Sequence, residues 1–167
     1  MELTFKEINL IGAVVLTGLS AGLFYAWQVS VIPGTAKVGN NTYLETMQSI
    51  NRAILNPAFF IVFFGSLITL SIASVYEFNT SKAVFGLFLG ASITYLVGTF
   101  GVTALGNVPL NNQLDVLNLG ELDSQKLDDF KTLYETKWNR LHLIRTVFSV
   151  LAFLLSVVGL VLHSKGG

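Results

Sequence analysis

The chain has 167 residues, of which 52% are hydrophobic and only 12% are charged, and it contains no cysteine. An average soluble domain carries about twice that charged fraction, so the composition argues against a water-soluble globule. Ten Lys and Arg residues balance ten Asp and Glu residues, which leaves no basic excess to attract nucleic acid. The lack of cysteine excludes disulfides, thiolate metal sites and a cysteine nucleophile. The composition indicates an integral membrane protein.

Four apolar stretches are long enough to cross a membrane, because a hydrocarbon core of roughly 30 Å needs about 20 helical residues. We predict spans at about 9–32, 57–76, 83–105 and 141–162. Pro33 is expected to stop the first span. The first stretch is longer than the apolar part of a signal peptide and lacks an A-x-A-like cleavage site, so it is predicted to be retained. The predicted fold is an all-α, integral membrane four-helix bundle in a single domain, 1–167.

The connections between the spans differ in length. The second and third spans are joined by a short turn, whereas long links run over 33–56 and 106–140. An even number of crossings places both long links on one side of the membrane and both termini on the other. Each link contains an amphipathic stretch at helical spacing. These stretches either lie in the headgroup region or cap a binding pocket.

The two halves, 1–78 and 79–167, follow the same plan of a span, a Pro-containing turn, an amphipathic helix and a returning span. This plan predicts a parallel duplication. The number of basic residues favours cytoplasmic links, whereas their density favours cytoplasmic termini, to which we lean. Few Arg and frequent Asn and Lys suit a bacterial inner membrane.

Small residues recur four apart in the first and third spans, notably Gly18 with Gly22 and Gly86 with Gly90. Such ridges let helices approach closely in lipid. They predict either a tight bundle or a homo-oligomer.

The strongest functional signal lies at the start of the fourth span, where Trp138, His142, Arg145 and Ser149 share one helix face. A charge inside the bilayer costs at least ~2.5–3.5 kcal/mol unless it snorkels or is paired. Arg145 therefore either reaches lipid phosphates or serves a site. His142 is either an ordinary interfacial histidine or a functional group.

Two further groups of polar residues are expected at the same membrane level. The segment GNVPLNN at 106–112 is predicted to break the third span. Its Asn107 and Asn111 can bind a ligand or satisfy the broken helix end. Gln48 and Asn51 on the first amphipathic helix either face water or join the same pocket.

Metal and nucleotide chemistry find little support. His142 and His163 lie about 30 Å apart on one helix, and no ligand spacing typical of zinc, copper or non-haem iron occurs. No nucleotide-binding motif is present. A haem with His142 as its single axial ligand remains an alternative.

Several motifs together carry a resemblance to a known family. They are Tyr25, Trp27 and Pro33 at the end of the first span, MQSIN at 47–51, Asn56-Pro57, GNVPLNNQL at 106–114, and W-N-x-x-H-x-x-R from Trp138 to Arg145. With these motifs, which extend over essentially the whole chain, the sequence resembles the anthrone-oxygenase-like family of small four-helix membrane proteins. The family's polar signature maps to Gln48, Asn51, Asn107, Asn111, Trp138, His142 and Arg145.

The resemblance implies oxidation of a lipophilic aromatic substrate by O₂ without an added cofactor, as fungal relatives oxidise polyketide anthrones to anthraquinones. An anthrone has an acidic C–H, and the enolate left by its deprotonation can pass an electron to O₂. In this hypothesis His142 is the base and Arg145 stabilises the enolate oxygen. The substrate-binding residues would be Gln48, Asn51, Asn107, Asn111 and, by stacking, Trp138.

Two other functions remain open from the sequence. One is a haem protein with His142 as axial ligand. The other is a non-enzymatic membrane component that binds a membrane lipid or another small molecule. A channel or transporter is less expected, because no polar stripe was found along a whole span.

Overall fold

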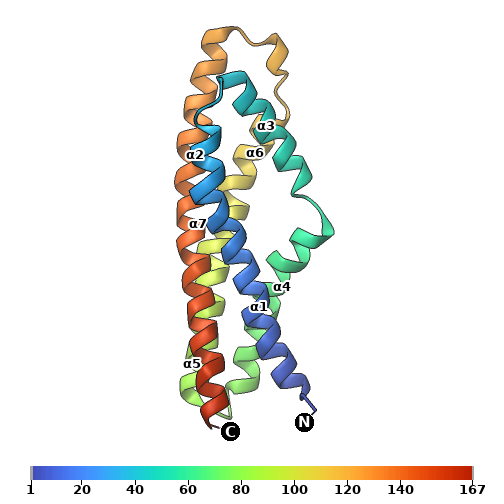
Figure 1. Ribbon diagram of the computed structural model, residues 1–167, viewed down its shortest axis with the longest axis vertical. Coiled ribbons are helices and arrows are strands. Elements are labelled where there is room, and N and C mark those ends of the chain that lie inside the picture. Colours follow the sequence, from blue (N-terminus) through green and yellow to red (C-terminus); the bar gives the residue numbers. More distant parts are fainter. Residues whose placement is uncertain (1, 167) are drawn as a thin grey trace.

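The computed structural model describes residues 2–166, which are almost entirely helical and contain no strand (Figure 1). The α-helices are α1 (Phe5–Ala26), α2 (Ile32–Thr35), α3 (Asn40–Ala53), α4 (Pro57–Glu77), α5 (Lys82–Thr94), α6 (Val108–Asp115) and α7 (Ser124–Gly166). Three π-helical segments, η1 (Trp27–Val31), η2 (Tyr95–Gly101) and η3 (Thr103–Asn107), and one 3₁₀ turn, η4 (Leu119–Glu121), complete the chain.

Four helical stretches are long and apolar enough to cross a membrane: Phe5–Thr35, Pro57–Glu77, Lys82–Asp115 and Ser124–Gly166. Helices α1, α4, α5 and α7 pack side by side, and the first and last of them have their free ends at the same end of the bundle (Figure 1). The predicted all-α membrane bundle is therefore confirmed. The parallel duplication and the orientation in the membrane stay predictions.

The helices run further than the predicted spans, because neither proline stops its helix. Pro33 lies in the first turn of α2, two residues after η1, and Pro109 lies in the first turn of α6, two residues after η3. A proline ring normally clashes with the carbonyl four residues earlier, and the wider π turn just before each ring accommodates it. The expected break of the third span at 106–112 is thus wrong, since that helix continues to Asp115.

The amphipathic stretch of the second link is the first part of α7 and not a separate helix. This helix of 43 residues is about 65 Å long at 1.5 Å per residue, about twice the thickness of the hydrocarbon core. Its N-terminal part packs with α3 and α6 around a second apolar cluster of Tyr43, Leu44, Met47, Leu114, Leu119, Tyr134 and Trp138. Helix α3 therefore lies against α6 and α7, so the two amphipathic stretches cover one another (Figure 1).

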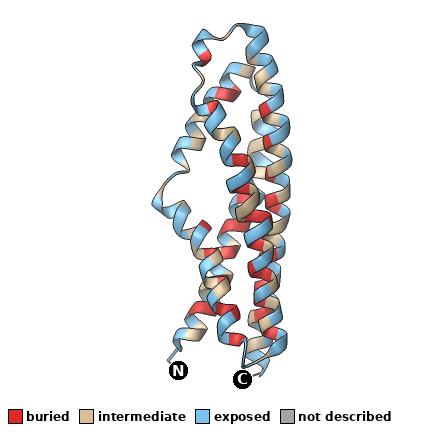
Figure 2. Ribbon diagram, turned by 180° about the vertical axis from the view of Figure 1, so that it is seen from behind, coloured by how far each residue is buried: buried red, intermediate tan, exposed pale blue. Residues whose placement is uncertain are grey.

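Buried residues follow the inner faces of the four long helices (Figure 2). Along α7, below the pocket described in the next subsection, these are the small or hydroxyl-bearing residues Thr146, Ser149, Ala152, Ser156 and Gly159. The three hydroxyls bond carbonyls of their own helix, so they satisfy themselves locally and let neighbouring helices approach.

Glycines provide the closest contacts inside the bundle. A Cβ at Gly98 would overlap the Phe148 ring, and a Cβ at Gly18 would lie 3.0 Å from the Phe153 ring. In contrast, Gly22 and Gly86 have nothing within 4 Å of an added Cβ. Gly18 therefore serves helix packing within the chain. The formation of a homo-oligomer through the ridges that contain Gly22 or Gly86 stays a prediction.

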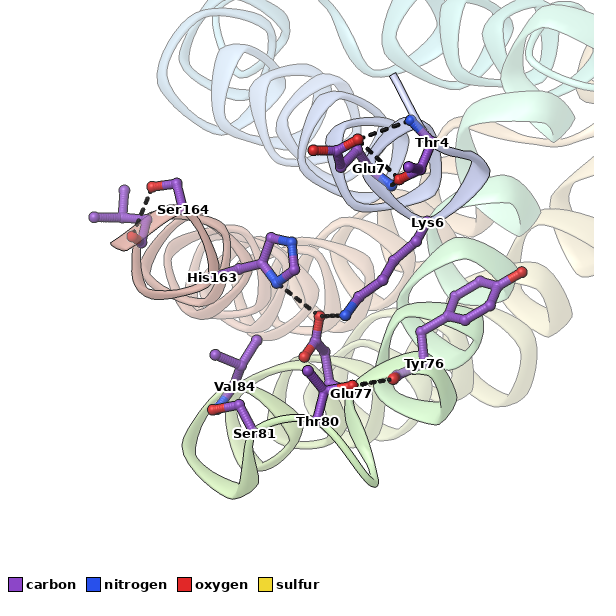
Figure 3. A network of polar contacts seen from close by, with 11 residues as sticks. Thr4, Lys6, Glu7, Tyr76, Glu77, Thr80, Ser81, Val84, His163 and Ser164 are labelled. Atoms are coloured by element: carbon purple, nitrogen blue, oxygen red, sulfur yellow. Dashed lines mark hydrogen bonds and ion pairs between the residues drawn. The ribbon is translucent and has the colours of Figure 1, made fainter. Parts of the chain in front are cut away.

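A buried carboxylate ties three helices together at the end where the termini lie (Figure 3). The Glu77 side chain is fully buried, and its Oε1 lies 2.9 Å from Lys6 Nζ and 2.9 Å from His163 Nδ1. These three residues come from α4, α1 and α7. The cluster fixes the ends of these helices against one another.

Candidate active site

A pocket of about 170 Å³ opens where the bundle meets the second apolar cluster. The end of α1, the start of η1, the end of α3, the start of α4, the helix from η3 through α6, and α7 all contribute to its walls. Its apolar lining is Leu23, Phe24, Trp27, Ile50, Ile54, Leu55, Phe59, Val108 and Trp138, and its polar lining is Asn51, Arg52, Thr103, Asn111, Asn112, Asp115, His142 and Arg145. It is an apolar cavity with converging polar groups, the usual form of a small-molecule site.

His142 and Arg145 meet in the wall of this pocket. Arg145 donates to His142 Nδ1 from Nε at 3.1 Å and from Nη2 at 2.9 Å. An arginine can only donate, so Nδ1 must carry a lone pair and the proton must sit on Nε2. That Nε2–H donates to the backbone carbonyl of Phe24 at 3.1 Å. The partners of the ring thus fix one neutral tautomer.

Arg145 is a buried cation without a carboxylate partner among residues 2–166. The residue is 92% buried, and the third hydrogen bond of its side chain runs from Nη1 to Thr103 Oγ1 at 3.4 Å. Of the five N–H donors of a guanidinium, two are left without a protein acceptor. The rings of Phe24 and Trp138 lie 4.6 and 5.1 Å from its Cζ atom, which stabilises the charge through cation–π contacts. The arrangement is suited to binding an electron-rich or anionic oxygen.

A chain of hydrogen bonds connects α3, α6 and α7 beside the pocket. Asn51 Nδ2 donates to the Tyr134 hydroxyl at 3.1 Å, and that hydroxyl donates to Asn111 Oδ1 at 3.2 Å. The indole N–H of Trp138 donates to the same Oδ1 at 2.8 Å. The Trp138 ring in turn stacks on His142, with centroids 5.0 Å apart and planes 6° apart. The chain therefore sets the position of the flat aromatic wall.

The π-helical segments direct polar side chains of the third span toward α7. Thr99, Thr103 and Asn107 are all buried there. Thr99 donates to the carbonyl of Arg145 at 3.5 Å, and Asn107 donates to the carbonyl of Trp138 at 3.3 Å. Such π segments recur at functional sites because they change which side chains face a neighbour.

An ion pair lies in the exposed part of the pocket lining. Arg52 on α3 and Asp115 at the end of α6 lie 2.5 Å apart between Nε and Oδ1, and both side chains are about half exposed. An ion pair this exposed contributes at most about 1 kcal/mol. It can therefore open at little cost.

Comparison with known proteins assigns the chain. A family model described as Anthrone oxygenase matches residues 58–155, more than half of the chain. This chain belongs to the anthrone oxygenase family. No match was found among curated proteins or among solved structures. The family makes the protein an oxygenase-like membrane protein, and the matched range holds most of the polar lining of the pocket.

The pocket brings together five of the seven predicted site residues: Asn51, Asn111, Trp138, His142 and Arg145. The other two lie outside its lining. Gln48 donates from Nε2 to the carbonyls of Leu114 and Leu117 at 2.8 and 3.1 Å and so satisfies the end of α6. Asn107 is fully buried against Trp138, and its Oδ1 has no hydrogen-bond partner in the part of the chain that the structure describes.

Sequence reasoning missed the contributions of Thr103 and Asp115 and of the Phe24 ring and carbonyl. Thr103 lies four residues before Asn107, a spacing that could have identified it. The other two depend on how α1 and α6 pack against α7, which no local pattern reveals.

The geometry also bears on the haem alternative. An axial histidine needs a ring nitrogen with a lone pair directed at the iron. In this pocket the Nδ1 lone pair faces the Arg145 guanidinium, and Nε2 donates to Phe24. A haem site at His142 would require at least the contact of the coordinating nitrogen, with Arg145 at Nδ1 or with Phe24 at Nε2, to break.

Proposed function

We propose that this member of the family uses O₂ to oxidise a flat, lipophilic aromatic substrate of the anthrone or quinol type in the pocket beside His142 and Arg145. The observation that carries the proposal is the buried Arg145 guanidinium, which has two unused donors and no carboxylate partner among the residues that the structure describes. A carbonyl oxygen that becomes an enolate oxygen is the ligand that such a group stabilises most.

Arg145 and His142 act in sequence in this proposal. The substrate oxygen accepts from the donors of Arg145 that have no protein acceptor, and the guanidinium turns toward it, so that Nε and Nη2 both leave His142 Nδ1. Nδ1 then has a free lone pair, which takes a proton from the substrate C–H. The Nε2–H bond to Phe24 keeps the ring in the required tautomer. Trp138 and Phe24 supply aromatic faces that hold flat rings.

The remaining steps need only O₂ as the oxidant. The enolate transfers one electron to O₂, and the resulting carbon radical and superoxide combine to form a C–O bond. The imidazolium of His142 returns its proton to the terminal peroxide oxygen. Loss of the second C–H proton with cleavage of the O–O bond then gives the new carbonyl and water. One CH₂ group and one O₂ become one C=O and one H₂O.

No bound cofactor takes part in the proposal, because the substrate enolate itself supplies the electrons. The proposal therefore expects purified protein without a Soret band. A Soret band lost in His142→Ala would instead support the haem alternative.

Oxygen uptake tests the proposal. The protein in lipid vesicles is given a hydroxylated anthrone, and O₂ consumption and anthraquinone formation are recorded against protein-free vesicles, because anthrones also oxidise spontaneously. We expect one O₂ per anthraquinone at a rate well above the background. Uptake equal to that of protein-free vesicles, repeated with a quinol, would overturn the proposal.

A further inference from the structure

A second hollow lies on the outside of the bundle, between the η3–α6 segment and α7. Its volume is about 490 Å³, and it is lined by Leu105, Gly106, Pro109, Leu110, Lys137, Arg140, Leu141 and Ile144. Leu105 in its wall is 85% exposed. We call this hollow the outer groove. It has an apolar body and two cationic side chains.

The outer groove is separate from the candidate active site. Successive residues of an α-helix are rotated by about 100°, so Lys137, Arg140, Leu141 and Ile144 form one face of α7. Trp138, His142 and Arg145 form the neighbouring face, which lines the pocket. In the wall of the groove, a Cβ at Gly106 would lie 2.9 Å from the Leu141 side chain, so η3 and α7 are in close contact there. The groove and the pocket share no lining residue.

The two cations of the outer groove have no acidic partner in the part of the chain that the structure describes. Lys137 and Arg140 are exposed and make no ion pair within 4.0 Å among residues 2–166. Two other lysines of the same helix are paired, Lys126 with Asp123 and Lys131 with Glu135, whereas Lys165 at the opposite end of α7 makes no ion pair within residues 2–166. Within the part of α7 that borders the groove, Lys137 and Arg140 are therefore the unpaired cations among the described residues.

Their height along α7 places these cations at the membrane surface. They stand just before Leu141, the predicted start of the fourth span, while Leu141 and Ile144 belong to its first turn. The groove therefore combines positive charge at headgroup level with an apolar surface directly beneath it. This order of charge and apolar surface complements a phospholipid that carries a net negative charge.

We propose that the outer groove binds one anionic phospholipid. Its phosphate lies between Lys137 and Arg140, and one acyl chain covers Leu105, Leu141 and Ile144. Removing either cation weakens binding about fivefold, and removing both weakens it about 30-fold, from the usual contribution of a basic side chain at an anionic lipid surface.

Native mass spectrometry of the full chain, released from nanodiscs of equal parts phosphatidylglycerol and phosphatidylcholine, tests this proposal. We expect one phosphatidylglycerol retained per chain in preference to phosphatidylcholine. The double variant Lys137→Gln/Arg140→Gln should lose this adduct. The control Lys37→Gln/Lys165→Gln, which removes the same charge elsewhere, should keep it. Equal loss in both double variants, or equal retention of the two lipids by the unaltered protein, would overturn the proposal.

Two further arms separate a lipid from a free phosphate and charge from folding. Inorganic phosphate added in excess should not displace the lipid, because it lacks the acyl chain. The exchange variant Lys137→Arg/Arg140→Lys keeps both charges and should retain the adduct. Displacement by phosphate, or loss of the adduct in the exchange variant, would contradict a site made of these two cations and the apolar groove.

Discussion

The guanidinium of Arg145 donates two hydrogen bonds to a single atom, Nδ1 of His142, one turn earlier on α7. The histidine is itself held by the Phe24 carbonyl of α1. A contact between two helices thus fixes the histidine, and the histidine fixes the arginine. The buried charge is positioned before any substrate arrives, which is the arrangement expected of an oxyanion site.

Substitution of His142 separates its positioning role from its role as a base. His142→Gln should keep an acceptor for Arg145 and a donor for Phe24, and so leave the melting temperature nearly unchanged. It should still lower the oxidation rate by about 10²–10⁴-fold, the usual contribution of a general base. His142→Ala should lose both rate and stability. A His142→Gln protein with the unaltered rate would show that His142 only positions Arg145.

Asn111→Leu should destabilise the protein by about 1–3 kcal/mol, because it leaves the buried donors of Tyr134 and Trp138 without their acceptor. It should also raise the KM, since the Trp138 ring loses its anchor. Denaturant unfolding in detergent measures the first effect and steady-state kinetics the second. Asn112→Leu is the matched control for unfolding, since the side-chain amide of Asn112 makes no hydrogen bond among residues 2–166. Equal unfolding of the two variants would contradict the network.

Gly98→Ala should prevent the normal packing of α5 and η2 on α7, because the new Cβ would overlap the Phe148 ring. We expect the free energy of unfolding to fall by about 1–3 kcal/mol, the usual cost of overpacking a core. Gly86→Ala adds the same methyl group where nothing lies within 4 Å and should be neutral or stabilising. Thermal unfolding of the two variants in one detergent provides the comparison, and the opposite order would refute this helix packing.

Glu77→Gln should loosen the end of the bundle where the termini lie. The substitution removes the buried negative charge that lies 2.9 Å from Lys6 Nζ and 2.9 Å from His163 Nδ1, and removing one partner of a buried ion pair is destabilising. The expected readout is faster amide exchange at the start of α1 and the end of α7, with Glu2→Gln on the exposed N-terminal segment as control. Unchanged exchange in Glu77→Gln would mean that the apolar packing alone holds these ends.

The sequence predicted the bundle well because the signal is physical and local. Asn56 begins α4 as expected, with its side chain accepting from the amide of Phe59 and Pro57 in the first turn. The helices past Pro33 and Pro109 were not foreseen, since a π turn leaves no pattern in residue type or spacing. Because proline is unfavourable inside a helix, its presence predicts a helix break at both positions, where the structure has none.

The candidate site was only partly predictable for a related reason. The face shared by Trp138, His142 and Arg145 follows from helical spacing alone. The partners that define its chemistry come from other helices, such as the Phe24 carbonyl. A backbone carbonyl carries no sequence signal. Gln48 looked like a ligand-binding residue because an amide that satisfies a helix end and an amide that binds a ligand are the same in sequence.

The most direct test of the central claim is the rate of anthrone oxidation by the Arg145 variants in vesicles. Arg145→Gln should lower the rate above background by about 10²–10³-fold, the cost of losing an oxyanion donor. Arg145→Lys keeps the charge but not the paired donors, and its rate should lie between those of Arg145→Gln and the unaltered protein. Lys165→Gln at the far end of α7 should match the unaltered protein. A folded Arg145→Gln protein that oxidises the anthrone at the unaltered rate would contradict the account.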